Sequence, residues 1–317
     1  MAETIRIGKY EIAPGVRAHL ELPVARLFTG TWLSLPVAVL HGRMPGPRLW
    51  LSATIHGDEL NGVEIIREVL QELDTHQLRG AIIAVPVVNV FGFIEQERYL
   101  PDRRDLNRSF PGSARGSLAA RLAHLFMREV VAQCQYGIDF HTGSQHRENL
   151  PQIRTDLEHP ETRRLALVFG APLIFQAPPI RGTLRWAARR RGVHYILYEG
   201  GEPLRFDDNV IATAVKGTLR VLDALGMWPC AELEAAPPPF EAAGTTWLRA
   251  NRSGIFKLDV ALGERVTKGQ ELGSISFDFF SNKAAPVKAP FDGLVMGYTN
   301  NPLVSRGQAL IHLARER

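Results

Sequence analysis

The stretch "LSATIHGDELNGVEIIREVLQEL", residues 51–73, decides the fold. It begins as an apolar strand, breaks at Gly57, and resumes as a helix whose apolar residues recur at intervals of three and four. His56 and Glu59 lie at the break, three residues apart. In the first turn of a helix, side chains at positions i and i+3 share one face. The spacing therefore predicts that both side chains can bind one ion.

Apolar strands and amphipathic helices alternate on the C-terminal side of this stretch. The strands and helices expected in chain order are strand 48–55, helix 61–73, strand 80–90, helix 117–134, strand 136–143, helix 162–170, strand 172–176, helix 183–192, strand 193–201 and helix 209–226. Short strands are expected over residues 4–48. This order predicts an α/β fold with a mostly parallel sheet flanked by helices.

A proline-rich segment ends the alternation. The sequence "ELEAAPPPFEAAG", residues 232–244, contains three consecutive prolines, which continue neither a helix nor a central strand. Beyond it, strand-sized pieces are separated by glycine turns. We therefore expect two domains, a catalytic domain over residues 1–230 that includes the N-terminal strands, and a small all-β domain over residues 240–317.

Composition and charge restrict the classes of function. The chain has 317 residues, 45% of them hydrophobic, and a formal net charge of +4, which favours anionic small molecules only weakly. Its densest basic cluster, "LRWAARRRGV" at 184–193, is expected to be a solvated helix face, because no recognised nucleic-acid motif accompanies it. No apolar run reaches the roughly 20 residues that span a bilayer, and no signal peptide is evident. We expect a cytoplasmic protein that binds neither nucleic acid nor membrane.

Chemically capable side chains follow three of the expected strands. His56, His141 and Glu199 come directly after "LWLSATI", "YGIDF" and "VHYILY". Because ligands collect beyond the carboxyl ends of parallel strands, we expect the three to converge. Two histidines and one carboxylate, here His56, Glu59 and His141, form the three-ligand set of a catalytic zinc, which leaves a fourth position for water.

Four motifs carry a resemblance to a known family. "HGDELNG", "DLNRSFPG", "DFHTG" and "YEGGEP" occur in this order over residues 56–203. In them the chain resembles the succinylglutamate desuccinylase and aspartoacylase family, a branch of the zinc carboxypeptidase-like fold. The resemblance implies one zinc ion per chain, held by His56, Glu59 and His141. It also implies that Glu199 is the catalytic glutamate, which takes a proton from the attacking water.

The resemblance also implies roles for the loop "ERYLPDRRDLNR", residues 97–108. Asn107 and Arg108 match the pair that holds the substrate carboxylate. Arg98 best matches the arginine that polarises the scissile carbonyl, with Arg103 and Arg104 as the alternatives. Arginine suits carboxylate recognition because its planar fork pairs bidentately.

Several residues near the motifs have two readings. Arg154 lies shortly after the third expected ligand, where it can reach a second substrate carboxylate. Asp58 and Asp139 flank expected ligands, and each is either a partner of a zinc histidine or an ordinary turn residue. The histidines outside the motifs, among them His146 and His312, are expected to be structural or solvated.

The predicted function is zinc-dependent removal of an acyl group from a small N-acyl amino acid. One alternative is a metallocarboxypeptidase that acts on short peptides, and a homo-oligomer is an open alternative to a monomer. A third reading is a carrier or binding protein, because the tail resembles a lipoyl-type β-sandwich with Lys283 near the position of a modified lysine. An inert β scaffold is the favoured interpretation of this tail.

Overall fold

The computed structural model describes residues 2–230, 234–277 and 283–317. The strands before residue 230 are β1 (Ile5–Ile7), β2 (Tyr10–Ile12), β3 (Arg17–Arg26), β4 (Trp32–His41), β5 (Met44–Ala53), β6 (Arg79–Val85), β7 (Tyr136–His141), β8 (Arg147–Thr155), β9 (Leu173–Gln176) and β10 (His194–Gly201). Those after it are β11 (Phe240–Arg249), β12 (Gly254–Leu258), β13 (Arg265–Val266), β14 (Glu271–Ser276), β15 (Ala284–Lys288), β16 (Gly293–Thr299), β17 (Leu303–Val304) and β18 (Ala309–Glu316). The helices are α1 (Asn61–Glu72), α2 (Val90–Glu95), α3 (Leu118–Glu129), α4 (Pro160–Phe169), α5 (Leu184–Arg189) and α6 (Asp208–Ala224).

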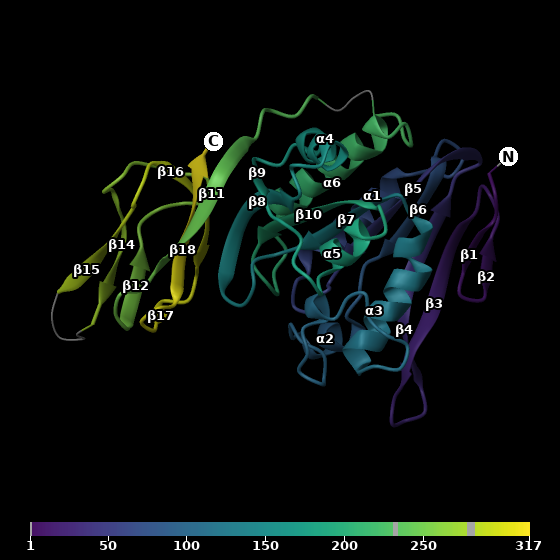
Figure 1. Cartoon of the computed structure of the whole chain (residues 1–317), viewed down its shortest axis with the longest axis horizontal. Helices are drawn as coiled ribbons and strands as arrows, with labels where there is room; N and C mark the ends of the chain where they lie inside the picture. The colour runs from purple at the N-terminus through teal and green to yellow at the C-terminus, as the bar shows by residue number, and fades with distance from the viewer. Residues whose placement is uncertain (1, 231–233, 278–282) are drawn as a thin grey trace.

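One long twisted sheet runs through the molecule (Figure 1). Its strand order is β13-β16-β18-β11-β9-β8-β10-β7-β5-β6-β4-β3. The pairs β10–β7, β7–β5 and β5–β6 at its centre are parallel. The expectation of a mostly parallel sheet is wrong at both ends, because β6, β4 and β3 pair antiparallel at one end and β11, β18, β16 and β13 pair antiparallel at the other. Within the sheet, β8 also runs antiparallel to β10. The fold is mixed α/β.

Helices pack on both faces of this sheet. α3 and α5 contribute to one apolar core, whereas α1, α4 and α6 contribute to the core on the opposite face. α1 illustrates why the sequence folds in this way: Ile65, Ile66 and Val69 lie on one side of the helix and are buried. α3 begins where the Ser117 hydroxyl accepts a hydrogen bond from the Ala120 amide.

Two local expectations differ from the structure. The strand expected over residues 80–90 ends at Val85, because Pro86 has no N–H to donate to the sheet. The residues that follow turn into α2, which the sequence pattern did not indicate. In the N-terminal region, β3 and β4 are 10 residues each and not short.

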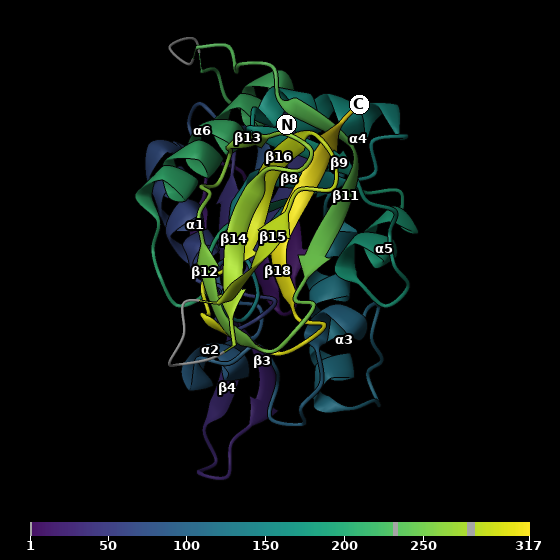
Figure 2. The ribbon, with the colours of Figure 1, turned by 90° about the vertical axis from the view of Figure 1, so that its left-hand side faces the viewer.

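The described residues after Phe240 form strands and turns without a helix. Figure 2 looks onto these C-terminal strands, with the rest of the molecule behind them. They make two sheets around an apolar core that includes Phe256, Leu272 and Ile311. One of the sheets continues the central sheet, since β11 pairs with β9 and β16 pairs with β8. The division of the chain into two domains stays a prediction.

Within the described part of the chain, no helix is long and apolar enough to cross a membrane.

Candidate active site

His56 and Glu59 lie in the connection between β5 and α1. The sequence placed them in the first turn of the helix, but α1 begins only at Asn61. A tight turn brings them together instead, because the Glu59 amide donates to the His56 carbonyl at 3.2 Å. Gly57 permits this turn to pack closely against α2, since a Cβ at Gly57 would lie 1.9 Å from the carbonyl carbon of Gly92.

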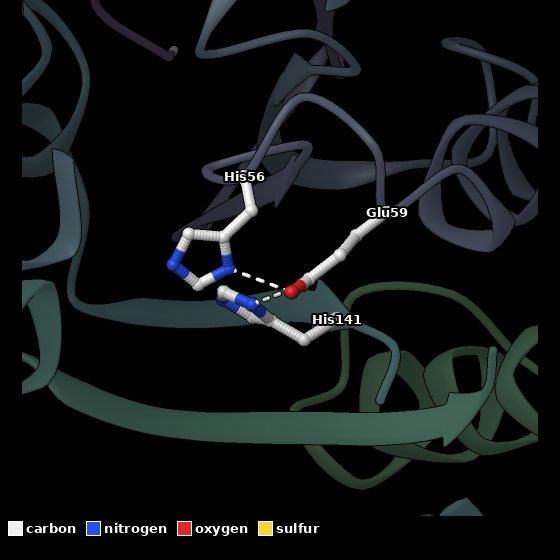
Figure 3. Close-up of side chains that lie close together, drawn as sticks. All are labelled: His56, Glu59 and His141. Atoms are coloured by element: carbon white, nitrogen blue, oxygen red, sulfur yellow. Dashed lines mark hydrogen bonds and ion pairs between the residues drawn. The ribbon is translucent and has the colours of Figure 1, made fainter. Parts of the chain in front are cut away.

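Glu59 stands between two histidines. Its Oε1 lies 2.7 Å from Nδ1 of His56, and its Oε2 lies 2.7 Å from Nδ1 of His141, the last residue of β7 (Figure 3). All three side chains are buried, and one ligand atom from each lies within 4.8 Å of the others. The convergence expected from the ends of two distant strands is therefore present.

A second carboxylate lies beside the remaining nitrogen of each histidine. Nε2 of His141 is 2.9 Å from Oδ2 of Asp139, and Nε2 of His56 is 3.3 Å from Oδ1 of Asp105. A carboxylate at Nε2 fixes the ring and directs Nδ1 towards the common centre. Of the two aspartates that flank the ligands in sequence, Asp139 thus contacts a histidine, whereas Asp58 has no hydrogen bond to either histidine among the described residues.

The electrostatics of this cluster are those of closely packed opposite charges. Burial alone would lower the pKa of His141, but Asp139 and Glu59 outweigh burial and hold this pKa well above its usual value. Burial would likewise raise the pKa of Glu59, but His56 and His141 outweigh it and hold the Glu59 pKa below its usual range. The carboxylates of Asp139 and Glu59 therefore favour a positive charge on the His141 ring.

These residues fit a zinc ion. Two imidazole nitrogens and a carboxylate oxygen are ligands that zinc takes in catalytic sites, and three protein ligands leave a position open. His56, Glu59 and His141 supply this set with their donor atoms already gathered.

Glu199 occupies the position next to His141 on the neighbouring strand. β10 and β7 pair in parallel with Glu199 opposite His141, so both side chains emerge on one face of the sheet. Two side chains of β8 hold its carboxylate: Asn149 donates to Oε2 at 3.2 Å, and Nη1 of Arg154 lies 3.5 Å from Oε1. Arg154 therefore lies beside Glu199, and its contact with a second substrate carboxylate stays a prediction.

The loop before α3 brings Arg98 to the same centre. Its guanidinium contacts Oε1 of Glu59 at 3.2 Å and Oδ2 of Asp105 at 3.1 Å. Arg103 and Arg104, the alternatives for the oxyanion role, are exposed and do not line the cavity. Among the three arginines, the geometry favours Arg98.

Asn107 and Arg108 follow in a short 3₁₀ turn, Leu106–Arg108. The Asn107 carboxamide accepts a hydrogen bond from the Leu184 amide at 2.9 Å, which ties the loop to the start of α5. Arg108 is exposed at the cavity, and its Nη1 donates to the Asn107 carbonyl at 2.7 Å.

All eight candidate residues line one cavity of about 470 Å³. These are His56, Glu59, Arg98, Asn107, Arg108, His141, Arg154 and Glu199. Ligand sites of small molecules have this order of volume.

Comparison with known proteins bears on this site directly. Residues 45–225, which contain all eight candidates, match the model of the succinylglutamate desuccinylase/aspartoacylase catalytic domain. The chain belongs to this family. It is 27% identical over 320 residues to the N-alpha-acetyl-L-2,4-diaminobutyric acid deacetylase of Halomonas elongata, an alignment that covers 95% of this chain and 92% of the relative.

Solved structures share the fold over nearly the whole chain, among them a succinylglutamate desuccinylase/aspartoacylase. The protein of this description from Rhodobacter sphaeroides superposes with a TM-score of 0.83 at 25% identity, covering 95% of this chain and 96% of the other. The product-bound ectoine utilization protein EutE (DoeB) of Ruegeria pomeroyi gives a TM-score of 0.83 at 23% identity, covering 94% of both chains. At 23% identity, the similarity to the Ruegeria protein is evidence of a shared fold only.

The cavity of this family member also has walls that the motifs did not indicate. Arg185 was expected on a solvated helix face, but it is 7% exposed, lines the cavity and donates to the carbonyls of Arg154 and Pro178. Arg185 is the first arginine of this cluster, and the sequence did not distinguish it from the exposed ones because only the packing of the short helix α5 turns it inward. Arg189, Arg190 and Arg191 are exposed, as expected.

The C-terminal strands close the far side of the cavity, beyond the residues that match the family model. Trp247 of β11 and His312 of β18 line it, with ring centroids 4.3 Å apart and planes at 9°. The Arg147 guanidinium also lies over the Trp247 ring, 5.1 Å from its centroid. His312 was expected to be a structural or surface residue, and no sequence motif surrounds it.

Proposed function

We propose that this protein is a zinc-dependent amidohydrolase that removes the acyl group from a small N-acyl amino acid in the cytoplasm. One observation carries the proposal: His56, Glu59 and His141 converge in the same cavity as Glu199. Membership of a family of desuccinylases and aspartoacylases, and similarity to a deacetylase, support hydrolysis of an acyl–amino acid bond.

Zinc in such a site acts as a Lewis acid that activates water and polarises a carbonyl. Glu199 is the proposed general base. It reaches the cavity from the strand position beside His141, and its carboxylate is oriented by Asn149 and Arg154. A carboxylate held in this way can accept the proton of the attacking water and return it to the departing amine.

Two arginines have different proposed roles, one in stabilising the transition state and one in binding the substrate. Arg98 lies against Glu59, where its guanidinium can stabilise the negative charge that develops on the scissile carbonyl oxygen. Arg108 and Asn107 lie at the cavity wall formed by the loop before α3, where a bidentate pair with a substrate carboxylate is accessible. The first contact belongs to the transition state and the second to binding.

The charge of the cavity supports an anionic substrate. Among the described residues, five arginines line it, Arg98, Arg108, Arg147, Arg154 and Arg185, against two carboxylates, those of Glu59 and Glu199. Arg154 is the proposed partner of a second substrate carboxylate. The Halomonas relative is named for an acetylated diamino acid, so acyl derivatives of diamino acids belong in any substrate screen beside those of acidic amino acids.

A hydrolysis screen tests the proposal. The substrates are N-acetyl, N-succinyl and N-formyl derivatives of acidic, neutral and diamino acids, with short peptides alongside, and released amine is measured. We expect release from acyl amino acids, and its loss when zinc is removed by a chelator. Release from peptides alone would support the metallocarboxypeptidase alternative, in which the recognised carboxylate lies on the other side of the amide.

The same preparation tests the carrier alternative. Lys283 is exposed immediately before β15 and follows residues 278–282, which lie outside the described residues. A lipoyl or biotinyl adduct on Lys283, seen in the intact mass, would support a carrier. We expect the unmodified mass.

A further inference from the structure

Three neighbouring strands carry a buried polar network behind the proposed metal centre. β5, β7 and β10 pair in parallel with Ser52 opposite Asp139 and Asp139 opposite Leu197. Residues at paired positions of a sheet point to the same face, as do residues two apart on one strand. Ser52, Asp139 and Tyr195 therefore share the face on which His141 lies.

Asp139 is fully buried and receives three hydrogen bonds from side chains. Ser52 donates to Oδ1 at 2.6 Å, Tyr195 donates its hydroxyl to Oδ2 at 3.0 Å, and Nε2 of His141 lies 2.9 Å from the same Oδ2. Both carboxylate oxygens are thus held from outside the metal centre. A carboxylate fixed at both oxygens cannot rotate about its terminal bond without losing a hydrogen bond.

The donors are themselves oriented. Trp50 donates its indole N–H to Oγ of Ser52 at 3.2 Å, so the serine hydroxyl uses its oxygen as acceptor there and directs its hydrogen to Asp139. The Trp50 ring also stacks on that of Tyr195, with centroids 5.9 Å apart. Gly137, the residue paired with both Trp50 and Tyr195, makes room for this contact, since a Cβ there would lie 2.3 Å from the indole ring.

We propose that Tyr195 and Ser52 are positioning residues, which hold the Asp139 carboxylate in the plane that orients His141 for metal binding. The inference rests on the proposed metal centre and extends it by two residues that no motif of the sequence contains. Tyr195 also lines the cavity. Its hydroxyl therefore connects the cavity side of β10, through Asp139, to the proposed zinc ligand His141 on β7. Partners of this kind typically affect metal affinity about 10- to 100-fold.

Tyr198 is a matched control for a role in packing alone. It lies on the same strand as Tyr195, is buried, and donates its hydroxyl to the Val210 carbonyl at 2.8 Å. Its side chain belongs to the core on the other face of the sheet, away from Asp139. Tyr198→Phe therefore removes an equivalent buried hydroxyl without touching the network.

The test is the zinc dissociation constant of the metal-depleted full chain, measured without substrate by competition with a chromogenic chelator. We expect Tyr195→Phe and Ser52→Ala each to weaken zinc binding about 10-fold or more, and Tyr198→Phe to leave it unchanged within about twofold. Because Ser52 acts on the other oxygen of the same carboxylate, it tests the network independently should Tyr195→Phe not fold. Wild-type affinity in either folded variant, or an equal loss in Tyr198→Phe, would overturn the proposal.

A double-mutant cycle separates action through Asp139 from a general loosening of the sheet. In the Asp139→Ala background, Tyr195→Phe should change the zinc affinity by less than about twofold, because the group through which it acts is gone. Equal effects in both backgrounds would overturn the inference. If the wild-type chain binds no zinc, the metal centre itself is refuted, and that outcome is distinguished from a failure of the network alone.

Discussion

Arg98 and Glu59 are in direct contact, with Nη1 of the arginine 3.2 Å from Oε1 of the glutamate. The loop before α3 thereby supplies a positive charge at the point where the β5–α1 connection and β7 supply the proposed zinc ligands. Arg108 is placed differently. It is exposed at the cavity wall, and within the described residues it contacts none of the proposed zinc ligands. The two arginines are therefore expected to affect different kinetic constants.

Arg98→Ala should mainly lower kcat, because the oxyanion that Arg98 stabilises exists only near the transition state. A charge-assisted contact of this kind contributes about 1.5 to 3 kcal/mol, or about 10- to 150-fold in rate. Steady-state kinetics on the best substrate of the screen measure this. Zinc content must be checked as well, because Arg98 also contacts Glu59 and Asp105. A rise in KM at unchanged kcat would assign Arg98 to binding instead.

Arg108→Ala should mainly raise KM, because a carboxylate held equally in ground and transition states contributes uniform binding. The expected size is again about 10- to 150-fold. Arg104→Ala, in the same loop but outside the cavity, is the matched control and should leave both constants near those of the wild type. A pure loss of kcat in Arg108→Ala would show that the roles of Arg98 and Arg108 are reversed.

Glu199→Gln should retain zinc and lose turnover. The amide is nearly isosteric with the carboxylate but cannot accept the proton of the attacking water, and general acid–base catalysis typically contributes about 10²- to 10⁴-fold. Glu202→Gln, three residues later and outside the cavity lining, controls for the loss of a negative charge at this end of β10. Activity of Glu199→Gln within a few-fold of the wild type would remove Glu199 from the mechanism.

His312 should make the protein sensitive to acid. Burial, with Arg154 and Arg147 nearby, lowers the pKa of His312 from 6.5 to about 3. The unfolded chain therefore takes up a proton near pH 6.5 that the folded protein does not accept until about pH 3, so stability falls as the pH decreases through this range. His312→Phe keeps a ring against Trp247 and removes the titrating group.

The measurement is the melting temperature of the metal-free protein between about pH 7 and pH 5. We expect a smaller decrease on acidification in His312→Phe than in the wild type. Because all other histidines are common to both proteins, the difference in slope reports on His312. Identical slopes would show that folding does not lower the pKa of His312.

Local sequence patterns were sufficient to locate the ends of the central strands. His141 and Glu199 follow apolar runs that are too short for helices, and parallel pairing then places them side by side. His56 and Glu59 were also located, although a turn and not the helix brings them together. Motif order added Arg98, Asn107 and Arg108, which lie in a loop without any periodic pattern.

What the sequence did not reveal depends on contacts between distant segments. Trp247 and His312 reach the cavity only because β11 pairs with β9 and β18 pairs with β11, and no local pattern encodes either pairing. Arg185 is turned inward by the docking of α5. Ser52 and Tyr195 read as ordinary residues of buried strands, and only the register across β5, β7 and β10 connects them to Asp139.

The zinc content of protein purified without added metal tests the central claim most directly. Elemental analysis should find about one zinc per chain in the wild type and almost none in His141→Ala. A site with three protein ligands loses most of its zinc affinity when one of them is removed. His146→Ala, which removes an exposed histidine five residues later, should retain the metal. Full zinc occupancy in folded His141→Ala would contradict the assignment of His56, Glu59 and His141 as the metal centre.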